Sequence, residues 1–269
     1  MIKHGSDVPP IDPLTHEFLV ACEVHSVARL RAVLDAGFDV HAPVDGVRPV
    51  TALVEMYSRS DAFPACLAVL LEAGGTLEDP QLAPVLLNDP DGLRAALAAD
   101  RGLVHYRTSL RCAFTPLEGV TLLHVAAEYG HRAVAEVLVG HGADVEARAG
   151  VDRDGLNGHT PLFHTVNSNG NRAAPVMALL LAHGARTDVM LRGVTWGRGF
   201  PWATTCFDVT PIGYAQLGAL PQFQRDEADL AANVRAMLTA AGRPVPTELN
   251  VPNQYLRGGL PSATKEDLR

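Results

Sequence analysis

The amino-acid sequence predicts an all-α fold that is built by stacking repeated helix-turn-helix units. A stripe of three apolar residues with the spacing i, i+3, i+4 recurs along the 269-residue chain, and a glycine follows each copy. This spacing places the three side chains on one face of a helix, and the glycine suits a left-handed residue at the helix end. The five copies are Leu30, Val33 and Leu34 with Gly37; Leu67, Leu70 and Leu71 with Gly74; Val134, Val137 and Leu138 with Gly142; Val176, Leu179 and Leu180 with Gly184; and Val234, Met237 and Leu238 with Gly242.

A shorter helix is expected before each stripe. The segments TLLH, TPLF and TPIG begin with Thr121, Thr160 and Thr210, whose hydroxyls can cap unpaired backbone N–H groups. In the last two segments a proline follows at the first helical position, where its missing N–H costs nothing. The small residues Ala126 and Ala127 allow a neighbouring helix to approach closely. Each unit is therefore predicted to be a pair of antiparallel helices.

Two segments resemble ankyrin repeats, namely GVTLLHVAAEYGHRAVAEVLVGHGADVEA at residues 119–147 and GHTPLFHTVNSNGNRAAPVMALLLAHGARTD at residues 158–188. The resemblance implies a solenoid of about six repeats, in which each helix pair covers the apolar face of the next and the loops form β-turns or hairpins. The third repeat, about residues 80–102, and the sixth are degenerate. The matching positions are Gly119, Thr121, Leu123, His124, Ala126, Ala127, Gly130, His131, Val137, Leu138, Gly142, Ala143 and Asp144.

The repeat domain is predicted to span residues 14–243. Residues 1–13 and 244–269 contain several prolines, which interrupt helices. We therefore expect an N-terminal extension and a C-terminal tail on either side of the domain.

An insertion at residues 190–208, before the last repeat, is the largest departure from the pattern. It holds both tryptophans of the chain in a locally basic, aromatic segment. Since Trp and Arg are enriched at interface hot spots, one hypothesis is a partner-binding loop, and alanine at both tryptophans should then weaken partner capture without loss of the fold. The alternative is a β-hairpin whose aromatic side chains pack on the neighbouring repeats. The candidate contacts are Trp196, Arg198, Phe200 and Trp202.

Further candidate contacts come from the inner helices and from a second insertion. The resemblance to ankyrin repeats places partner contacts just after the alanine pair of each inner helix. Amide-rich positions there suit hydrogen bonding to a polypeptide, and the alternative is an ordinary hydrated surface. The second insertion, residues 148–160, is either part of the site or a solvated turn rich in glycine and aspartate. The candidates are Glu128, Tyr129, Asn167, Ser168 and Asn169 on the inner helices, and Asn157 in the second insertion.

The leading functional hypothesis is a non-catalytic scaffold that binds a protein or peptide on its concave face and on the insertion loop. The alternative is an enzyme or small-ligand sensor with a pocket between the 190–208 insertion and the inner helices, near His164, Ser168 and Asp208. A deep pocket closed by a tryptophan over His164 would favour this alternative. The sequence contains no GxSxG, HExxH or glycine-rich phosphate loop, so no catalytic residue, metal ligand or cofactor is predicted.

Composition narrows the partner class. The formal net charge of −8 argues against nucleic-acid binding, which needs a basic surface. No apolar run approaches the roughly 18 residues that span a bilayer, so we expect no membrane association and a cytoplasmic protein. We also expect a monomer. Richness in alanine, arginine and proline suggests a bacterial genome of high GC content. Cys22, Cys66, Cys112 and Cys206 lack CxxC spacing and are predicted to be reduced packing thiols.

Overall fold

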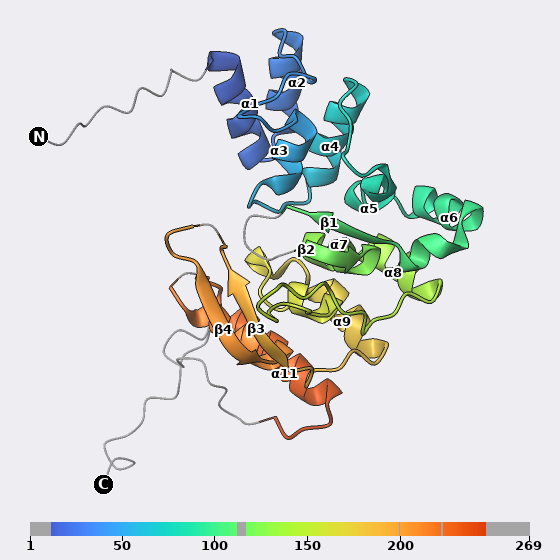
Figure 1. Cartoon of the computed structure of the whole chain (residues 1–269), viewed down its shortest axis with the longest axis vertical. Helices are drawn as coiled ribbons and strands as arrows, with labels where there is room; N and C mark the ends of the chain where they lie inside the picture. Colours follow the sequence, from blue (N-terminus) through green and yellow to red (C-terminus); the bar gives the residue numbers. More distant parts are fainter. Residues whose placement is uncertain (1–11, 112–116, 199, 222, 246–269) are drawn as a thin grey trace, which may run out of the picture. The chain divides into compact units, whose positions relative to one another are not determined.

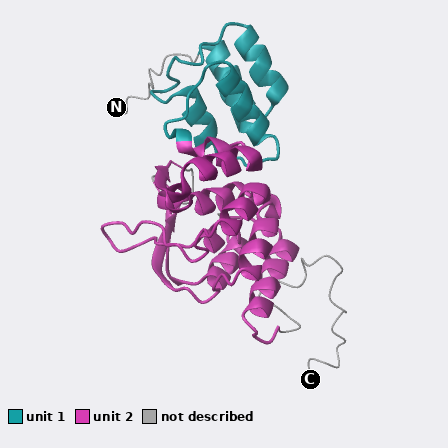
Figure 2. Cartoon of the chain, turned by 90° about the vertical axis from the view of Figure 1, so that its right-hand side faces the viewer, with its two compact units in different colours: residues 1–80 teal, residues 81–269 magenta. Residues whose placement is uncertain are grey.

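The structure is a computed structural model that describes residues 12–111, 117–198, 200–221 and 223–245 (Figure 1). The predicted N-terminal extension and C-terminal tail lie almost entirely outside these ranges. The described residues divide into two compact units, unit 1 within residues 1–80 and unit 2 within residues 81–269 (Figure 2). Each unit has its own buried apolar core.

Unit 1 consists of two helix pairs. Helix α1 (Pro13–Glu23) packs on α2 (Val27–Asp35) and α3 (Pro49–Glu55), and α4 (Phe63–Glu72) packs on α2 and α3. The carboxylate of Asp12 caps α1 by accepting a hydrogen bond from the Thr15 amide at 3.0 Å. The fully buried side chains of this core include Phe18, Leu30, Leu53, Leu67 and Leu70.

Unit 2 contains four helix pairs, each of which contacts the next. The first pair is α5 (Ala83–Leu86) and α6 (Pro90–Ala99), flanked by the 3-10 turns η1 (Pro80–Leu82) and η2 (Arg101–His105). The others are α7 (Leu122–Tyr129) with α8 (Arg132–Gly140), η3 (Pro161–His164) with α9 (Ala174–Ala182), and α10 (Pro211–Gln216) with α11 (Glu227–Ala240). The first members stack in the order α5, α7, η3, α10, and the second members stack in the order α6, α8, α9, α11. The helix-turn-helix stacking predicted for this part of the chain is confirmed.

The predicted apolar stripes lie on the second helix of the pairs in which they occur, and their glycines end those helices. Gly37, Gly74, Gly142, Gly184 and Gly242 all have positive φ, between 63° and 96°. After α8, for example, the amides following the helix donate to the carbonyls of Val139 and Leu138 at 3.0 and 2.9 Å. The third stripe residue is only partly buried in unit 1, at Leu34 and Leu71, so the stripes of α2 and α4 are narrower than predicted.

The expectation of an all-α fold is incomplete, because two antiparallel two-stranded sheets are present. Strand β1 (Arg107–Leu110) pairs with β2 (Leu117–Thr121), and β3 (Leu191–Trp196) pairs with β4 (Thr204–Val209). The loop at residues 148–160, between α8 and η3, is hydrogen-bonded to both hairpins. The Gly150 amide donates to the Glu118 carbonyl at 2.7 Å, and the Asn157 amide donates to the Gly193 carbonyl at 2.7 Å. These hydrogen bonds satisfy backbone groups that long inter-repeat loops would otherwise leave unpaired.

The inner helix predicted for the fifth repeat is wrong beyond its first turn. After η3 the backbone is irregular as far as η4 (Asn169–Asn171), where Gly170 has φ 58° and Asn171 has φ 53°. Asn and Ser side chains compete with the helical backbone for hydrogen bonds, and the Ser168 hydroxyl accepts from the Ala173 amide at 3.0 Å. The Arg225 guanidinium also donates to the Asn167 carbonyl at 2.7 Å, which replaces a helical bond with a tertiary one.

Two smaller expectations concern membranes and thiols. Across the described ranges, none of the helices combines the length and apolar character that crossing a bilayer requires. Cys22 and Cys66 are buried free thiols in unit 1, and burial raises the pKa of Cys66 to about 11. Cys206 is a partly buried free thiol on β4, and Cys112 lies outside the described residues.

Candidate partner-binding site

The predicted insertion folds as the β3–β4 hairpin. Its strands are rich in β-branched and aromatic residues, which favour extended backbone. The register pairs Trp196 with Thr204 and Thr195 with Thr205, and the hydroxyl oxygens of the two threonines of the second pair lie 2.9 Å apart. The alternative hypothesis of a packed hairpin therefore describes the conformation of this segment.

A column of aromatic rings runs from the tip of this hairpin into the core, and we call it the aromatic column: Phe200, Trp202, Trp196, Phe223 and Tyr214. At the tip, the rings of Phe200 and Trp202 are stacked with centroids 4.7 Å apart and planes 11° apart. Trp202 lies 5.1 Å from Trp196, which stacks on Phe223 at 4.1 Å. Exposure falls along the column, from 44% at Phe200 and 39% at Trp202 to 5% at Trp196. The tip thus presents two aromatic rings that are held from beneath.

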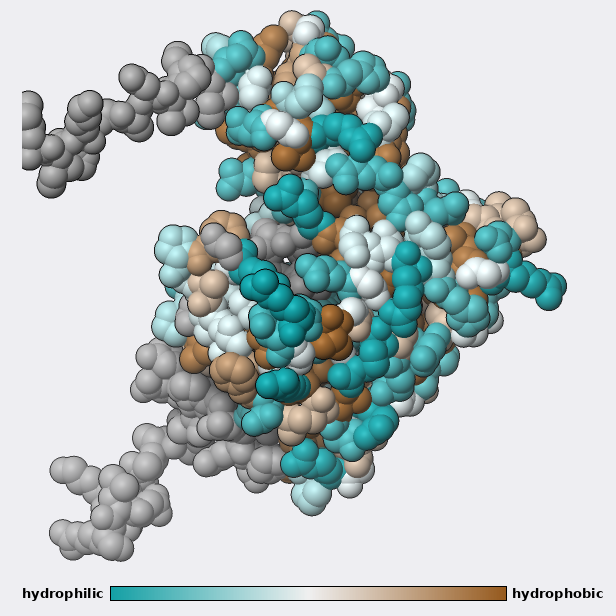
Figure 3. Space-filling model, in the orientation of Figure 1, coloured by the Kyte–Doolittle hydropathy of each residue, from teal (hydrophilic) through white to brown (hydrophobic). Residues whose placement is uncertain are grey.

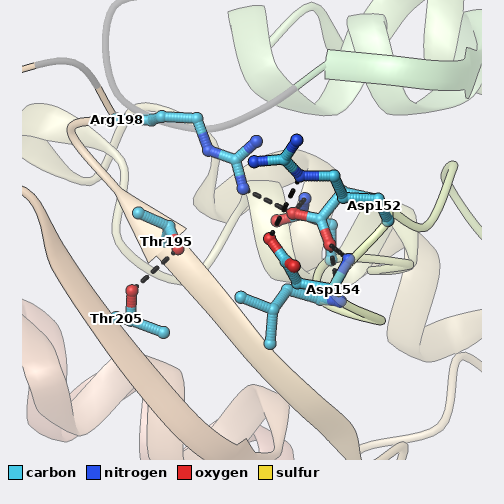
Figure 4. A network of polar contacts seen from close by, with 8 residues as sticks. Asp152, Asp154, Thr195, Arg198 and Thr205 are labelled. Atoms are coloured by element: carbon cyan, nitrogen blue, oxygen red, sulfur yellow. Dashed lines mark hydrogen bonds and ion pairs between the residues drawn. The ribbon is translucent and has the colours of Figure 1, made fainter.

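A salt bridge joins the hairpin tip to the second insertion. Arg198 donates from its guanidinium to the carboxylate of Asp152, and the two side chains point toward each other in Figure 4. The other oxygen of that carboxylate accepts from the Asp154 and Leu156 amides at 3.0 and 2.9 Å. Hydrogen bonding to Arg198, followed by the Leu156 amide, lowers the pKa of Asp152 below its ordinary value. The carboxylate therefore stays ionised and organises the turn and the tip together.

Polar side chains surround a pocket of about 240 Å³ beside the irregular inner segment. One wall comes from residues 166–171 and the other from residues 224–233, around the start of α11. The two walls are tied together, because the side-chain amide of Asn233 donates to the Val166 carbonyl at 3.2 Å and to the Asn171 side-chain oxygen at 2.9 Å. The candidates Ser168 and Asn169 line this pocket.

A group of three buried histidines lies between α7 and η3. The His124 and His164 ring centroids are 5.7 Å apart, and those of His159 and His164 are 4.5 Å apart. The Nδ1 atom of His164 lies 2.8 Å from a Glu128 carboxylate oxygen. His124 accepts from the Thr121 amide at Nδ1 and lies 3.1 Å from the His159 carbonyl at Nε2, which fits a neutral ring protonated at Nε2. Burial, with His164 as the next cause, lowers the pKa of His124 to about 3.

No hydrogen bond joins the residues suggested for a catalytic alternative to one another within the described ranges. The His164 ring is fully buried against Glu128, whereas Ser168 caps the Ala173 amide through its hydroxyl. Asp208 is exposed on β4. Because the inner segment is not a helix, the i, i+4 spacing of His164 and Ser168 has no meaning as a shared helical face. Within the described ranges, no group of three or more His, Cys, Asp or Glu residues is arranged to hold a metal ion.

The predicted contact residues fall into two classes of burial. Tyr129, Asn157, Asn167 and Trp196 are buried, so their side chains are not exposed for the direct partner contacts that were expected of them. Tyr129 lies on the buried side of α7, and the Asn157 backbone amide donates to the Gly193 carbonyl on β3. The candidates that reach the surface are Glu128, Ser168, Asn169, Arg198, Phe200 and Trp202.

A family model for ankyrin repeats, in three copies, matches residues 93–191. Residues 93–191 of the chain are ankyrin repeats. The match runs from α6 to the first residue of β3, and it ends where the aromatic insertion begins. Ankyrin repeats generally mediate protein–protein interaction. The hairpin and the α10–α11 pair, which hold most of the candidate site, lie beyond the matched residues.

Part of the chain is similar in sequence to a curated protein. The ADP-ribosylation factor GTPase-activating protein AGD2 of Arabidopsis thaliana is 38% identical over 73 residues. The aligned segment is 27% of this chain and 8% of the relative's length. The ankyrin-repeat protein therefore corresponds to only a small part of that relative.

Several residues that build the site were not predicted. Phe223 anchors Trp196, Asp152 holds Arg198, and Arg225 and Asn233 shape the pocket. Asp152 had a usable signal, since it lies in the second insertion, at residues 148–160. Phe223 and Arg225 carried no such signal, because they lie in the irregular stretch between α10 and α11 and only the tertiary fold brings them to the inner segment.

Proposed function

We propose that the ankyrin-repeat protein is a non-catalytic scaffold whose unit 2 binds a protein or peptide partner. The partner would contact the hairpin tip, through Phe200, Trp202 and Arg198, and the polar inner surface, through Ser168 and Asn169. The observation that carries this proposal is the stacked, exposed Phe200–Trp202 pair on a hairpin that is fixed from beneath by Trp196 and Phe223.

Preorganisation gives the tip its physical advantage. Large aromatic side chains dominate interface energetics, and they contribute most when little freedom is lost on binding. Gly197 has φ 68°, and a Cβ built there would lie 1.9 Å from the Trp202 ring, so a larger residue at this position would displace that ring. The Arg198–Asp152 bridge fixes the other side of the tip.

The surface around the tip suits a partner that also exists unbound. On the side of unit 2 seen in Figure 3, hydrophobic side chains are interspersed with hydrophilic ones. Interfaces of this mixed kind are typical of non-obligate complexes, with an apolar centre and a polar rim. Glu128 adds a carboxylate to the inner surface, where its oxygen is shared with His164.

The experiment is affinity capture from the native cell with three forms of the full chain. The wild type is compared with the Phe200→Ala/Trp202→Ala variant and with Phe207→Ala as a matched control. Phe207 is 67% exposed on the same hairpin, but its ring makes no contact with the aromatic column. We expect a set of proteins that the wild type and the control retain and the double variant loses, with unchanged far-UV circular dichroism. Equal capture by all three forms would refute the proposed site.

A further inference from the structure

The pocket beside the inner segment has the size of one long side chain. Its volume is about 240 Å³. Pockets for drug-sized molecules and cofactors are larger, about 300–1,000 Å³. The volume therefore suits a single amino-acid side chain better than a nucleotide or other cofactor.

The lining of the pocket is negatively charged. Val166 and Leu230 belong to the lining but are buried, at 0% and 2% exposure, while Asp226 and Asp229 bring two carboxylates from the start of α11. Among the described lining residues, Arg225 is the only cation. Its guanidinium donates to the backbone carbonyls of Asn167 and Phe223 at 2.7 and 3.0 Å. The lining therefore carries two formal negative charges against one positive charge.

The start of a helix ordinarily favours an anion, but here that position is already filled. The carboxylate of Asp226 accepts from the Ala228 and Asp229 amides at 2.9 and 3.2 Å, so these helix-terminal donors are satisfied. An incoming anion would also face the Asp229 carboxylate. Among the described residues, that carboxylate has no hydrogen-bond or salt-bridge partner.

The pocket is also preformed. Asn233 bridges the two walls through the Val166 carbonyl and Asn171, and Ser168 is fixed by the Ala173 amide. A preformed pocket with an unpaired carboxylate in its lining matches a side chain that has a cationic head. A site that need not reorganise loses little entropy when such a side chain enters.

We propose that this pocket binds a basic side chain, arginine or lysine, of the partner. The cationic head pairs with Asp229 and donates a further hydrogen bond to the Asn169 side-chain oxygen. This proposal rests on the proposed function, because it identifies the partner as one that carries an exposed basic residue beside the segment held by the aromatic tip.

The test uses small probes on the full-length, ¹⁵N-labelled protein. N-acetyl-arginine amide and N-acetyl-lysine amide are titrated while the backbone amide signals of Asn169 and Asp229 are followed by NMR. N-acetyl-citrulline amide has nearly the shape of the arginine probe without its charge. We expect saturable shifts with either or both basic probes, and binding of the citrulline probe weaker by about tenfold or more, because charge-assisted hydrogen bonds are lost.

Two variants keep the test specific. Asp229→Asn should weaken the basic probes by about tenfold, because it removes the charge and preserves the shape. Glu136→Gln makes the same charge change on α8, where Glu136 pairs with Arg132 away from the pocket lining, and should bind as the wild type does. Equal affinity of the arginine and citrulline probes, or an unchanged affinity in Asp229→Asn, would overturn the proposal. Such a result would leave the hairpin-tip site intact, since that site is tested separately through Phe200 and Trp202.

Discussion

Replacing Trp196 by alanine should destabilise unit 2 by about 3–5 kcal/mol, the usual cost of truncating a buried aromatic side chain. Trp196 is 5% exposed and loses two ring contacts in this variant, with Phe223 at 4.1 Å and with Trp202 at 5.1 Å. Because each repeat depends on its neighbours, the loss should fall mainly on the hairpin and on the α10–α11 pair. This corrects the expectation that both tryptophans can be removed without loss of the fold.

The matched variant is Trp202→Ala. Trp202 is 39% exposed and stacks on the exposed Phe200 ring, so we expect a smaller loss, of about 1 kcal/mol. Urea denaturation followed by far-UV circular dichroism measures both variants, and amide hydrogen exchange shows where the protection is lost. Two results would refute the assignment of a buried and an exposed end to the aromatic column. One is a Trp196→Ala variant whose free energy of unfolding lies within about 1 kcal/mol of the wild type. The other is a larger loss for Trp202→Ala than for Trp196→Ala.

Leu138→Ala should cost about 2–5 kcal/mol in the same assay, whereas Glu136→Ala on the exposed face of α8 should change the free energy of unfolding by less than about 0.5 kcal/mol. Stability should also fall as the pH drops from about 6.5 toward 3, because the pKa of His124 is about 3 when folded and ordinary when unfolded. Protons then bind the unfolded chain preferentially, which lowers the free energy of unfolding by about 2 kcal/mol at pH 5. An equally steep fall in a His124→Gln variant would contradict this origin. Asp152→Asn should raise hydrogen exchange at the hairpin tip around Arg198, measured by mass spectrometry, and unchanged exchange would show that the salt bridge does not order the tip.

The candidate site could be predicted only in part. The aromatic insertion pointed to Phe200 and Trp202, and both reach the surface. The same composition also pointed to Trp196, which is buried, because a sequence gives residue type but not the side of a hairpin on which a side chain lies. Asn167 was assigned to a helix surface, but its segment is irregular and its side chain donates to the Tyr214 carbonyl.

The repeat pattern was determined by the sequence itself. Stripes spaced i, i+3, i+4 with a following glycine are local features, so the second helix of five pairs could be read from them: α2, α4, α8, α9 and α11. Leu138 and Leu180 are fully buried, as that pattern requires. The site was decided by the tertiary structure. Contacts such as Trp196 with Phe223 and Arg198 with Asp152 join segments that no local periodicity relates, and the balance between Arg225, Asn233 and the inner segment determines whether that segment forms a helix or the wall of a pocket.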